Sequence, residues 1–536
     1  GCVDPRGTLK RLDPAPNRHL CSTDPDRLDH HRGSTVQPII PEKKMNSNAA
    51  ENKDESTWLV VDLGTTSIKG GLFHSNGNLI RETSHPNQQT QTDEGFHHQE
   101  LETWWNGFIA VINDLMNPEV TLQGLVLTGQ MQNMIFLDSH SEPLNPVVSY
   151  SDQRGAEQIA RWYDEKSLQE QLLETGNEQG PTSLLAKLVW FQQHRPEVLK
   201  NTEKIFIGSA DYIGYRLTGV NQTDTTTAAT TGLMKLSSRT WHTALFAELG
   251  LDSILPSLPR LVPGGALLGS LRNEVSQHLK LVAGLPVYLG PGDAGSTTLG
   301  AGCGKLGKAY AYCGTSGWVG LTEKRPARLE SGAWTLAHPA ADLFIQVAPI
   351  LTAGDNLAWV KELFGFNSYE EMVQIAIEQP AGKLLYLPYL QGERSPFIDP
   401  HARGVWLGMN RQSNRASLTR AVLEGTCFAF RHALHAVSEV RVEELILTGG
   451  TSRSDSFCQL FANVLGISIK VLAEPGLTGL RGALASCQQE SATPEPRIQK
   501  TYLPSSDQMN NYDDLFKIFL ESYPALRSSF AQLAKL

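Results

Sequence analysis

The chain lacks three features, and each absence excludes a class of protein. Its seven cysteines are scattered, with no C-x-x-C pair and no cysteine–histidine cluster. We therefore expect reduced, mostly buried thiols of an intracellular protein rather than a zinc site or a disulfide framework. No apolar run approaches the roughly 20 residues that cross a bilayer. With 46 basic and 56 acidic residues the net charge is −10, which argues against a general nucleic-acid or membrane-surface binder.

What the chain has is length and an ordinary globular composition. At 536 residues it is long for one core, so two or more domains are expected. The first 56 residues mix Pro, Asp, Arg and His with almost no apolar periodicity, and we predict that they are disordered. They contain no apolar core typical of a secretory signal, and their aspartates do not suit an organelle transit peptide. We interpret Met45 as the natural start, or close to it, with a partner-binding tail as the less favoured alternative.

Order is predicted to begin at Trp58. Residues 58–61 form a buried-strand pattern, a glycine turn follows at 62–67, and a second strand at 69–73 leads into a hairpin turn at 75–77. A Walker loop leads from a strand to a helix, so this strand–turn–strand unit is not one. Further along, the sequence predicts a set of helices (101–116, 155–174, 184–194) and strands (122–129, 204–207).

One internal echo indicates a duplicated architecture. The segment "DLGTTSIKGGL" at Asp62–Leu72 is matched by "AYCGTSGWVGL" at Ala311–Leu321, because both read as a strand, G-T-[TS], a short turn and a strand. A repeat at this scale favours two similar lobes, each offering a glycine–hydroxyl hairpin to something between them. Chance similarity of short Gly/Thr turns is the alternative.

The glycine-rich stretch from Tyr288 to Gly307 allows several interpretations. Gly290, Gly292 and Gly295 spell G-x-G-x-x-G, but an acid within such a loop would repel a pyrophosphate, and the ribose-binding acid expected about 20 residues later is missing. A phosphate loop at 300–305 is one residue short, and Lys305 is followed by Leu306 rather than by Ser or Thr. We interpret 300–307 as a small-residue helix face packed closely on a neighbour, followed by a turn.

Asp293 is the one carboxylate among these glycines. A carboxylate on a tight turn beside phosphate-binding hairpins can accept the proton of a hydroxyl that attacks a phosphoryl group. An aspartate that only caps the helix predicted at 294–302 is equally compatible with the local sequence. The residues of this stretch leave the two interpretations open.

Seven motifs in order resolve the choice by resemblance. They are "DLGTTSIKGGL", "TGQMQ", "YSDQRG", "GPGDAGSTTLGAG", "YCGTSG", "LPYLQGERSPFIDPHARGVWLGM" and "LILTGGTSRSDSFCQLFANVLG". Together, over Trp58–Gln489, they resemble the FGGY family of carbohydrate kinases. The resemblance implies an α/β fold of two actin/hexokinase-like (ribonuclease H-like) lobes with ATP and sugar in the cleft between them. It implies a sugar-binding lobe at 57–302 and a nucleotide-binding lobe at 303–490, and we expect a helical C-terminal tail at 491–536.

The resemblance also implies which residues bind ATP and Mg²⁺. The first phosphate motif comprises Asp62, Gly64, Thr65, Thr66, Ser67 and Lys69, in which Asp62 is expected to position magnesium and Lys69 to add charge. A solvated strand residue is the alternative for Lys69. The second phosphate motif comprises Gly314, Thr315 and Ser316. The adenosine side is expected to comprise Gly354, Ala358, Gly449, Gly450, Thr451 and Ser454.

On the sugar side the resemblance implies that Asp293 is the general base. The expected substrate-binding residues are Gln130, Met131, Gln132, Asp152, Arg154, Asp293 and Ala294. Gln132 stands where members acting on xylulose commonly have histidine, and Ala294 where they commonly have asparagine. The first change keeps hydrogen-bonding capacity and loses the titratable ring, whereas the second removes a donor and an acceptor. The implied reaction is ATP-dependent phosphorylation of a sugar hydroxyl, with D-xylulose first and D-ribulose, gluconate or glycerol behind it.

Other acids in the motifs are predicted to be structural. We expect Glu393–Arg394 and Asp399–Arg403 to be ion-paired loop anchors, Asp224 to order a hydroxyl-rich turn, and Asp355 to cap a helix. Two rival classes share the architecture, an actin-like ATPase or scaffold and a non-catalytic sugar sensor. An intact Asp293 speaks against the sensor, and "GERSP" with "GQMQ" against the scaffold. The expected partner is a small sugar in the cytoplasm, with no nucleic acid or membrane, and a homodimer is one assembly that the sequence allows.

Overall fold

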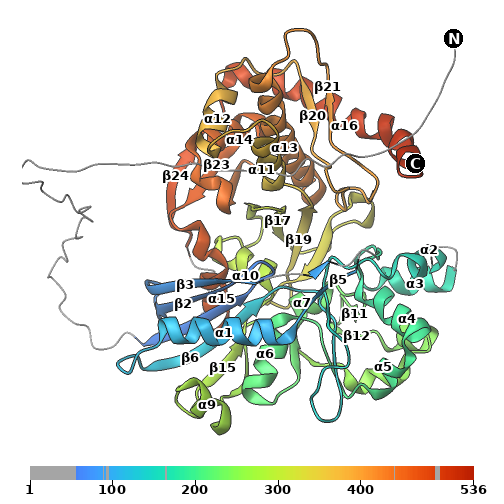
Figure 1. Ribbon diagram of the computed structural model, residues 1–536, viewed down its shortest axis with the longest axis vertical. Coiled ribbons are helices and arrows are strands. Elements are labelled where there is room, and N and C mark those ends of the chain that lie inside the picture. The colour runs from blue at the N-terminus through green and yellow to red at the C-terminus, as the bar shows by residue number, and fades with distance from the viewer. Residues whose placement is uncertain (1–55, 88–89, 92–95, 163–165, 440, 489–494) are drawn as a thin grey trace, which may run out of the picture. The chain divides into compact units, whose positions relative to one another are not determined.

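The computed structural model describes residues 56–87, 90–91, 96–162, 166–439, 441–488 and 495–536 (Figure 1). Met45 and the rest of the segment predicted to be disordered up to residue 55 lie outside the described residues. Residues 54–536 form one compact unit. We call residues 56–302 the first half and residues 303–536 the second half.

The first half is built on a six-stranded sheet in the order β14-β15-β6-β1-β2-β3. Its strands are β1 (Thr57–Leu63), β2 (Ser67–His74), β3 (Leu79–Pro86), β6 (Leu122–Gly129), β14 (Ala266–Ser270) and β15 (Pro286–Leu289). Strands β1, β6 and β15 run parallel, while β2, β3 and β14 are antiparallel to their neighbours. Apolar residues of α1 (Leu101–Leu115) and α6 (Ser209–Thr218) share one core with this sheet.

The second half repeats this plan in a seven-stranded sheet, ordered β18-β19-β17-β16-β22-β23-β24. Its strands are β16 (Ala309–Cys313), β17 (Gly317–Glu323), β18 (Trp334–Ala337), β19 (Phe344–Ile350), β22 (Glu444–Thr448), β23 (Ser468–Leu472) and β24 (Ile498–Tyr502). Here β16, β22 and β23 run parallel, with β17, β19 and β24 antiparallel. Without β18 the two sheets match strand for strand, so the echo between the G-T hairpins is a true repeat of the fold.

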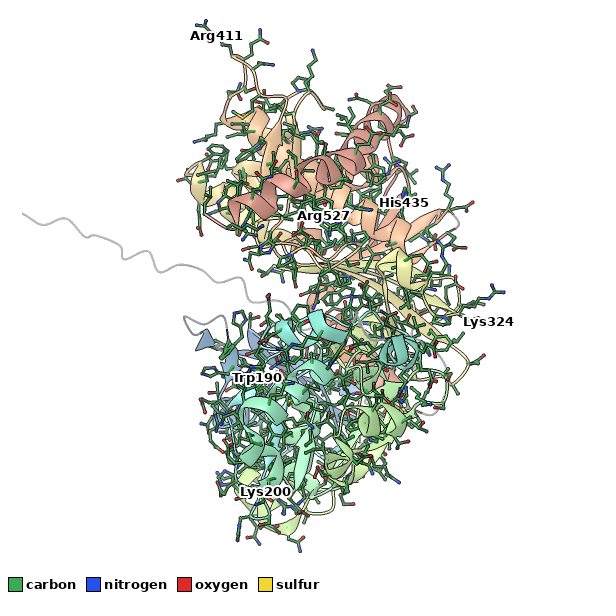
Figure 2. All side chains as sticks on the ribbon, turned by 90° about the vertical axis from the view of Figure 1, so that its right-hand side faces the viewer. Trp190, Lys200, Lys324, Arg411, His435 and Arg527 are labelled. Atoms are coloured by element: carbon green, nitrogen blue, oxygen red, sulfur yellow. The ribbon has the colours of Figure 1, made fainter. Side chains whose placement is uncertain are left out.

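Between β6 and β15 the first half carries an insertion with a hydrophobic core of its own. Its helices are α2 (Ala156–Trp162), α3 (Lys166–Leu173), α4 (Leu184–His194), α5 (Pro196–Asn201), α7 (Thr225–Ala229) and α8 (Thr243–Glu248), and β7 (Ile135–Leu137) pairs with β9 (Lys204–Phe206). The helical region predicted at 155–174 contains two helices rather than one. In Figure 2, Trp190 and Lys200 mark this insertion, and Arg411 and Arg527 mark the second half.

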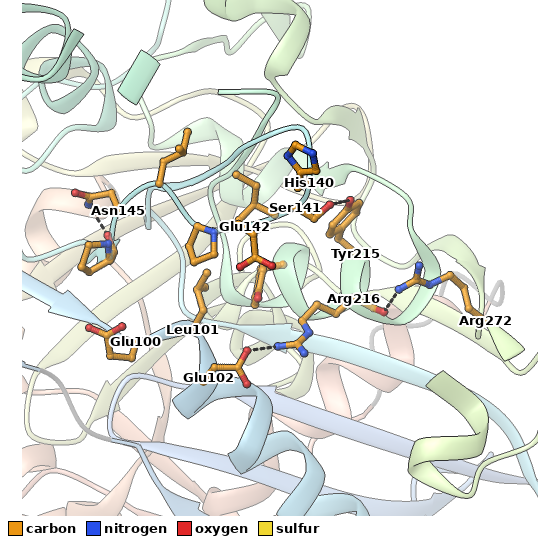
Figure 3. Close-up of a pocket in the computed structure, with 15 residues that line it drawn as sticks. Glu100, Leu101, Glu102, His140, Ser141, Glu142, Asn145, Tyr215, Arg216 and Arg272 are labelled. Carbon is orange, nitrogen blue, oxygen red and sulfur yellow. Dashed lines mark hydrogen bonds and ion pairs between the residues drawn. The ribbon is translucent and has the colours of Figure 1, made fainter. Parts of the chain in front are cut away.

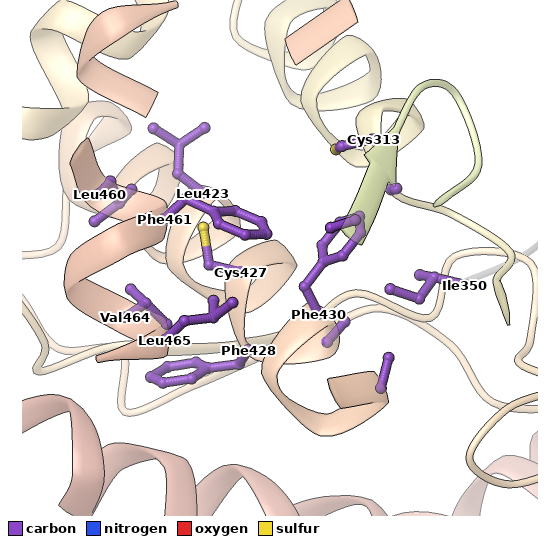
Figure 4. Close-up of a cluster of buried hydrophobic side chains, with 14 of the residues drawn as sticks. Cys313, Ile350, Leu423, Cys427, Phe428, Phe430, Leu460, Phe461, Val464 and Leu465 are labelled. Atoms are coloured by element: carbon purple, nitrogen blue, oxygen red, sulfur yellow. The ribbon is translucent and has the colours of Figure 1, made fainter. Parts of the chain in front are cut away.

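The helices of the second half pack around α13 (Arg415–Val437), on which Cys427, Phe428 and Phe430 are fully buried (Figure 4). The others are α11 (Gly354–Leu363), α12 (Tyr369–Ile377), α14 (Asp455–Leu465) and α16 (Ser506–Leu533). The tail predicted as helical at 491–536 also contains strand β24, which adds an edge to the sheet. Tyr512 of α16 is fully buried in the same core. Its hydroxyl donates to Glu424 Oε1 at 2.8 Å and so supplies that buried acid with a partner.

Two helices cross where the halves meet. Helix α10 (Asp293–Gly300) follows β15, and α15 (Thr478–Cys487) follows β23 at the equivalent place in the repeat. A Cβ atom on Gly300 would lie 1.8 Å from the carbonyl oxygen of Thr478, and one on Gly482 would lie 1.7 Å from that of Ser296. Only glycine permits such contact between helix backbones. Of the small-residue helix face predicted at 300–307, only Gly300 is helical and packs closely on its neighbour, because α10 ends there and turns follow it.

The described residues bear on three expectations from the sequence, which concern membrane spans, cysteines and metal clusters. Within these ranges no helix is both long enough and apolar enough to pass through a bilayer. The five cysteines they contain are unpaired and buried: Cys303, Cys313, Cys427, Cys458 and Cys487. They include no cluster of three or more His, Cys, Asp or Glu side chains suited to a metal ion.

Candidate active site

Asp293 is the first residue of α10, and the N-cap position belongs to Gly292. Its Oδ1 accepts the backbone N–H of Ala294 at 2.7 Å, and the side chain keeps part of its surface exposed. Burial, together with the nearby Asp62 carboxylate, raises the pKa of Asp293 to about 7. A carboxylate with this pKa is suited to take a proton near neutral pH. The cap alternative is therefore weaker than it was from the sequence alone.

Asp62 is the acid whose negative charge helps to raise the pKa of Asp293. It lies near the end of β1, directly across the hairpin from Lys69 in the strand register. Burial raises the pKa of Asp62, and the Lys69 charge opposes that shift. Its Oδ1 is buried without a hydrogen-bond partner among the described residues. Mg²⁺ takes one or two carboxylates with water and phosphate oxygens as its other ligands, so this orphan oxygen fits a metal bound together with a nucleotide.

The turn that joins Asp62 to Lys69 is tight. A Cβ on Gly64 would lie 2.8 Å from the carbonyl oxygen of Ser67, so only glycine fits there without a shift of the backbone. Thr66 and Ser67 complete the turn between β1 and β2, and Thr66 accepts a bond from the N–H of Asn87 at its carbonyl oxygen. The structure therefore brings together the residues of the first predicted phosphate motif: Asp62, Gly64, Thr65, Thr66, Ser67 and Lys69.

Gln130 connects this hairpin to the predicted sugar loop. Its Oε1 accepts the Thr65 hydroxyl at 3.2 Å, and its Nε2 donates to Gln99 Oε1 at 2.7 Å. The side chain is buried. Both ends of the amide are thus used inside the protein, which favours a linking role over direct contact with a ligand.

The next two residues, Met131 and Gln132, continue the predicted sugar loop. A Cβ on Gly292 would lie 2.4 Å from Met131 Cγ, so Met131 covers the turn that precedes Asp293. Gln132 has a left-handed backbone (φ 60°) and donates its Nε2 to the carbonyl oxygen of Thr230 at 3.0 Å. With its nitrogen fixed, Gln132 keeps its amide oxygen as an acceptor. Met131 and Ala294 both pack against the cluster of Leu336, Ile345 and Val347.

Asp152 and Arg154 form a buried pair that uses most of their polar atoms. Arg154 Nε and Nη2 donate to the two carboxylate oxygens of Asp152 at 2.8 and 2.9 Å. The guanidinium also lies over the rings of Phe96, Trp190 and Phe191, at 4.6, 4.8 and 5.3 Å. Such a pair holds the shape of its loop. Their predicted role in substrate binding would therefore be to support the sugar loop.

Lys187 lies beside this pair and was not singled out from the sequence. It is fully buried, and its Nζ donates to the carbonyl oxygen of Ser149 at 2.8 Å. Burial lowers the pKa of Lys187 to about 7, against the opposing pull of Asp152. A lysine within the apolar helix α4 gives no periodicity signal, so its placement could be found only from the structure.

The second hairpin carries Gly314, Thr315 and Ser316 between β16 and β17. Helix α11 begins on it, because Gly354 N–H donates to Gly314 O at 2.8 Å and Asp355 N–H to Thr315 O at 3.0 Å. The Thr315 and Ser316 side chains are exposed. Ala358 follows one helical turn after Gly354 and is half-buried. The structure thus places these predicted nucleotide-side residues together.

The predicted adenosine motif lies against the start of the same hairpin. Gly449 has φ 99°, and a Cβ there would lie 2.5 Å from the carbonyl oxygen of Cys313. Thr451 donates its hydroxyl to that oxygen at 3.1 Å. Gly450 faces open space, and Ser454 caps α14. The predicted strand–glycine–helix order is confirmed, with a short 3₁₀ turn at Gly450–Arg453 between strand and helix.

The two ion-paired anchors predicted in the 390–406 loop are wrong in detail. Among the described residues neither Glu393 with Arg394 nor Asp399 with Arg403 makes an ion-pair contact. Glu393 Oε1 instead accepts the backbone N–H groups of Leu351 and Arg394 at 3.0 and 2.9 Å, and burial raises its pKa to about 8. Asp399 accepts the Tyr523 hydroxyl at 2.8 Å, and Arg403 donates to backbone carbonyls. Backbone N–H groups hold Glu393 and the Tyr523 hydroxyl holds Asp399, because a buried carboxylate needs hydrogen-bond donors.

The predictions for the two remaining acids, Asp224 and Asp355, fare differently. Asp224 is the N-cap of α7 and accepts the N–H and the hydroxyl of Thr227 at 3.0 and 2.6 Å, as expected of a residue that orders a turn. Asp355 lies in the first turn of α11 rather than at its cap, and accepts Gln391 Nε2 at 3.1 Å. Its prediction as a cap is therefore corrected.

Sequence reasoning missed two aromatic residues beside this site. The rings of Tyr312 and Trp318 stack with centroids 4.2 Å apart and an angle of 18°. The signal for them was present in the echo, because aligning Gly64 with Gly314 places Tyr312 at the position of Asp62. In the sequence, Tyr312 lies in an apolar strand pattern, and such an aromatic residue is normally read as part of the hydrophobic core.

Two open hollows on the described surface lie away from these residues. The one in Figure 3 has a volume of about 650 Å³ and is lined by residues such as Glu102, His140, Tyr215, Arg216 and Arg272. Of its charged groups, Arg216 pairs with Glu102 at 2.7 Å. None of the predicted site residues lines it, so this hollow is separate from the candidate site.

Comparison with known proteins agrees with this arrangement. Residues 57–300 and 309–487 match the N-terminal and C-terminal domains of the FGGY family of carbohydrate kinases. A xylulose kinase of Bacillus subtilis (strain 168) is 28% identical over 482 residues, which cover 86% of this chain and 96% of that protein.

Solved structures extend the likeness to the fold. A ligand-bound xylulose kinase from Lactobacillus acidophilus has a TM-score of 0.84 at 25% identity, covering 89% of this chain and 100% of that one. A gluconate kinase from the same organism has a TM-score of 0.83 at 25% identity, with the same coverage. The predicted α/β fold of two actin/hexokinase-like lobes is thereby confirmed. Matched in both domains and over most of its length, the chain belongs to the FGGY family of carbohydrate kinases and is a sugar kinase.

Proposed function

We propose that this sugar kinase transfers the γ-phosphoryl group of ATP to a hydroxyl of an open-chain sugar, with D-xylulose as the first candidate. The observation that carries the proposal is the position of Asp293, at the start of α10 and within electrostatic reach of Asp62. One acid is suited to accept a proton, and the other to hold a metal beside the phosphates.

The transfer can be written with the residues of this chain. The acceptor hydroxyl gives its proton to the Asp293 carboxylate, and its oxygen forms a bond to the γ-phosphorus. The bond from that phosphorus to the β,γ-bridging oxygen breaks, and ADP leaves. The turn at Gly64–Ser67 and the turn at Gly314–Ser316 offer backbone N–H groups and hydroxyls to the phosphate oxygens. Lys69 adds positive charge on the Asp62 side.

Asp62 would hold Mg²⁺ through its unpaired Oδ1. A bound Mg²⁺ neutralises charge on the phosphate oxygens and fixes their orientation. The adenosine end of the nucleotide would lie along Gly449, Gly450, Thr451 and Ser454, with Gly354 and Ala358 on its other side. Gly450 supports this placement because it leaves open space where a side chain would stand.

The sugar would lie between Gln132, Met131, Ala294 and Asp293. Gln132 offers its amide oxygen to a sugar hydroxyl, while Asp152 and Arg154 support the loop from behind. The relatives include kinases named for xylulose and for gluconate, so D-ribulose, gluconate and glycerol are the next candidates. We also propose that the lobes divide near residue 302 and that the enzyme acts in the cytoplasm, and we leave a homodimer open to measurement.

A screen of acceptors tests the proposal. ADP release is measured with the full chain, Mg-ATP and each of a panel of pentuloses, pentitols, hexonates and glycerol. We expect ADP to form only with an acceptor, and kcat/KM to be highest for D-xylulose. ADP formation without any acceptor would identify an actin-like ATPase. Acceptor binding without ADP formation would identify a sugar sensor, and a higher kcat/KM for another sugar would replace D-xylulose.

A further inference from the structure

The two hairpins place different residues at one equivalent position. When Gly64 is aligned with Gly314, Asp62 of β1 corresponds to Tyr312 of β16. Their cross-strand partners also correspond, since Asp62 pairs with Lys69 and Tyr312 pairs with Trp318 in the two registers. The repeat of the sheets therefore directs Tyr312 toward the site from the second half, as it directs Asp62 from the first.

The hydroxyl of Tyr312 lies over the second predicted phosphate turn. A Cβ atom on Gly314 would lie 2.7 Å from Tyr312 Oη, so the ring folds back over that turn. The side chain is half-buried, and its hydroxyl makes no hydrogen bond to any residue that the structure describes. A phenol held beside a phosphate turn with its O–H unused is available to donate to a ligand there.

The ring is held from behind by a hydrogen-bonded chain that ends at the Asp293 helix. Trp318 stacks on Tyr312 and donates its Nε1 to Tyr310 Oη at 2.9 Å. Tyr310 Oη in turn donates to the carbonyl oxygen of Ala294 at 3.2 Å. Tyr310 precedes Tyr312 by two residues on the same face of β16, about 6.6 Å along the strand. Because Tyr310 contacts the residue after Asp293, Tyr312 lies on the face of β16 that is turned to the start of α10.

Charge gives a second indication of where the hydroxyl lies. Burial raises the pKa of Tyr312 to about 12, and Asp62 and Asp293 both add to that shift. The phenol is therefore near both carboxylates and remains protonated at neutral pH. A protonated hydroxyl near two acids can donate a hydrogen bond without adding to the negative charge of the site.

We propose that Tyr312 is a catalytic residue whose hydroxyl donates a hydrogen bond to the phosphoryl group as it moves from ATP to the acceptor. This inference rests on the proposed function of the site. Tyr312 keeps its proton throughout, while the acceptor's proton goes to Asp293 and the electron pair of the broken bond leaves with ADP. Donors placed where charge develops stabilise a transition state strongly. Trp318 and Tyr310 act as positioning residues for this donor.

Replacing the hydroxyl while keeping the ring tests the proposal. Tyr312→Phe retains the stacking on Trp318 and should lower kcat by about 10²-fold, in the range seen when one such donor is removed. The matched control is Tyr288→Phe, since Tyr288 is also half-buried on a strand and contacts the ring of Trp58. The control should leave kcat unchanged.

Binding supplies a readout that does not depend on turnover. We expect Tyr312→Phe to weaken binding of a non-hydrolysable β,γ-imido analogue of ATP by about tenfold, worth about 1.4 kcal/mol, with ADP binding unchanged. Calorimetry with Mg²⁺ present measures both constants. Equal losses for the two nucleotides would make Tyr312 a structural residue. A normal kcat in Tyr312→Phe would overturn the proposal while leaving the kinase intact, whereas absence of kinase activity in the unmodified chain would overturn the proposed function itself.

Discussion

The two hairpins occupy the same place in matching sheets, yet they carry opposite kinds of side chain. The first presents Asp62 with Lys69 across from it, whereas the second presents Tyr312 with Trp318. The helices that follow differ in the same way, because α10 begins with Asp293 and α15 begins with Thr478. Thr478 uses its hydroxyl on Thr448 and Pro475, at 3.0 Å each. The duplicated backbone provides two similar frames, and the ionisable chemistry is concentrated in one of them.

The largest effect expected from this contrast is on Asp293. Asp293→Asn removes the proton acceptor and should lower kcat by about 10²–10⁴-fold, because loss of a general base has that effect. Affinity for the nucleotide should remain near its original value. Steady-state kinetics and nucleotide titration measure the two quantities.

Asp211 supplies the matched control for that variant. It also lies in the first turn of a buried helix, and burial raises its pKa to about 7. Asp211→Asn should keep kcat. A weak nucleotide affinity with normal kcat in Asp293→Asn would instead give Asp293 a metal-binding or structural role.

The next largest effect concerns the crossing of α10 and α15. Gly482→Ala places a Cβ 1.7 Å from a backbone oxygen, and overpacking of this kind should destabilise the fold by about 3 kcal/mol or more. Gly476→Ala is the control, because a Cβ there meets no atom within 4 Å. Thermal unfolding compares the two variants. Equal melting temperatures would show that the two equivalent helices do not depend on glycine for their contact.

Gln132 tests whether the first half also selects the sugar. Gln132→Ala leaves the Thr230 carbonyl without its donor and should cost about 1–3 kcal/mol in kcat/KM for the true sugar. Nucleotide affinity should hardly change. The variant is measured over the same panel of acceptors. An unaltered ranking of sugars, at equal kcat/KM, would remove Gln132 from the specificity argument.

A smaller effect should appear in the pH dependence of stability. The pKa of Asp211 is raised to about 7 in the native state from an ordinary value of 3.8. Between these values the native state binds a proton that the unfolded state releases, so stability falls as pH rises through this window. Asp211→Asn should therefore gain melting temperature relative to the parent above pH 7, and the gain should vanish near pH 4. A constant difference across that range would contradict the raised pKa.

No effect is expected from the segment that precedes both halves. Deleting residues 1–44 should leave the melting temperature and kcat unchanged, because the repeat of sheets and both hairpins lie beyond it. Thermal unfolding and the ADP-release assay make the comparison. A clear loss in either would show that this segment belongs to the fold or to the site.

Much of the fold could be predicted because local patterns determined it. The helix at 184–194 has the predicted bounds, and the strands around both G-T turns follow buried apolar runs. Strand β24 was missed because it lies at the sheet edge with exposed residues such as Ile498, so its burial pattern gives no alternation. The echo and the family resemblance predicted two similar lobes, but the order of strands within each sheet was not predicted.

The site was predicted less completely, because partners far apart in sequence decide what each polar group can do. Gln130 reads as a sugar ligand beside Met131, yet Thr65 and Gln99 occupy its amide. Arg394 reads as the partner of Glu393, yet backbone N–H groups meet that carboxylate instead. Tyr312 is identified as the equivalent of Asp62 only when the strand registers of the two sheets are compared. Residue type and spacing indicate candidates, and the folded contacts decide among them.

The amide of Gln130 has a consequence for how the two substrates act on one another. Its oxygen receives the hydroxyl of Thr65 in the proposed nucleotide hairpin, while its neighbours Met131 and Gln132 belong to the proposed acceptor side, where Met131 covers the turn before Asp293. If the Thr65 hydroxyl donated to a bound phosphate instead, Gln130 would lose that hydrogen bond. The loop of Met131 and Gln132 could then change conformation when an acceptor binds. Linkage then requires reciprocity, so that nucleotide changes the dissociation constant of the acceptor by the same factor as acceptor changes that of nucleotide. This one side chain would make synergistic binding of nucleotide and acceptor a property of the fold.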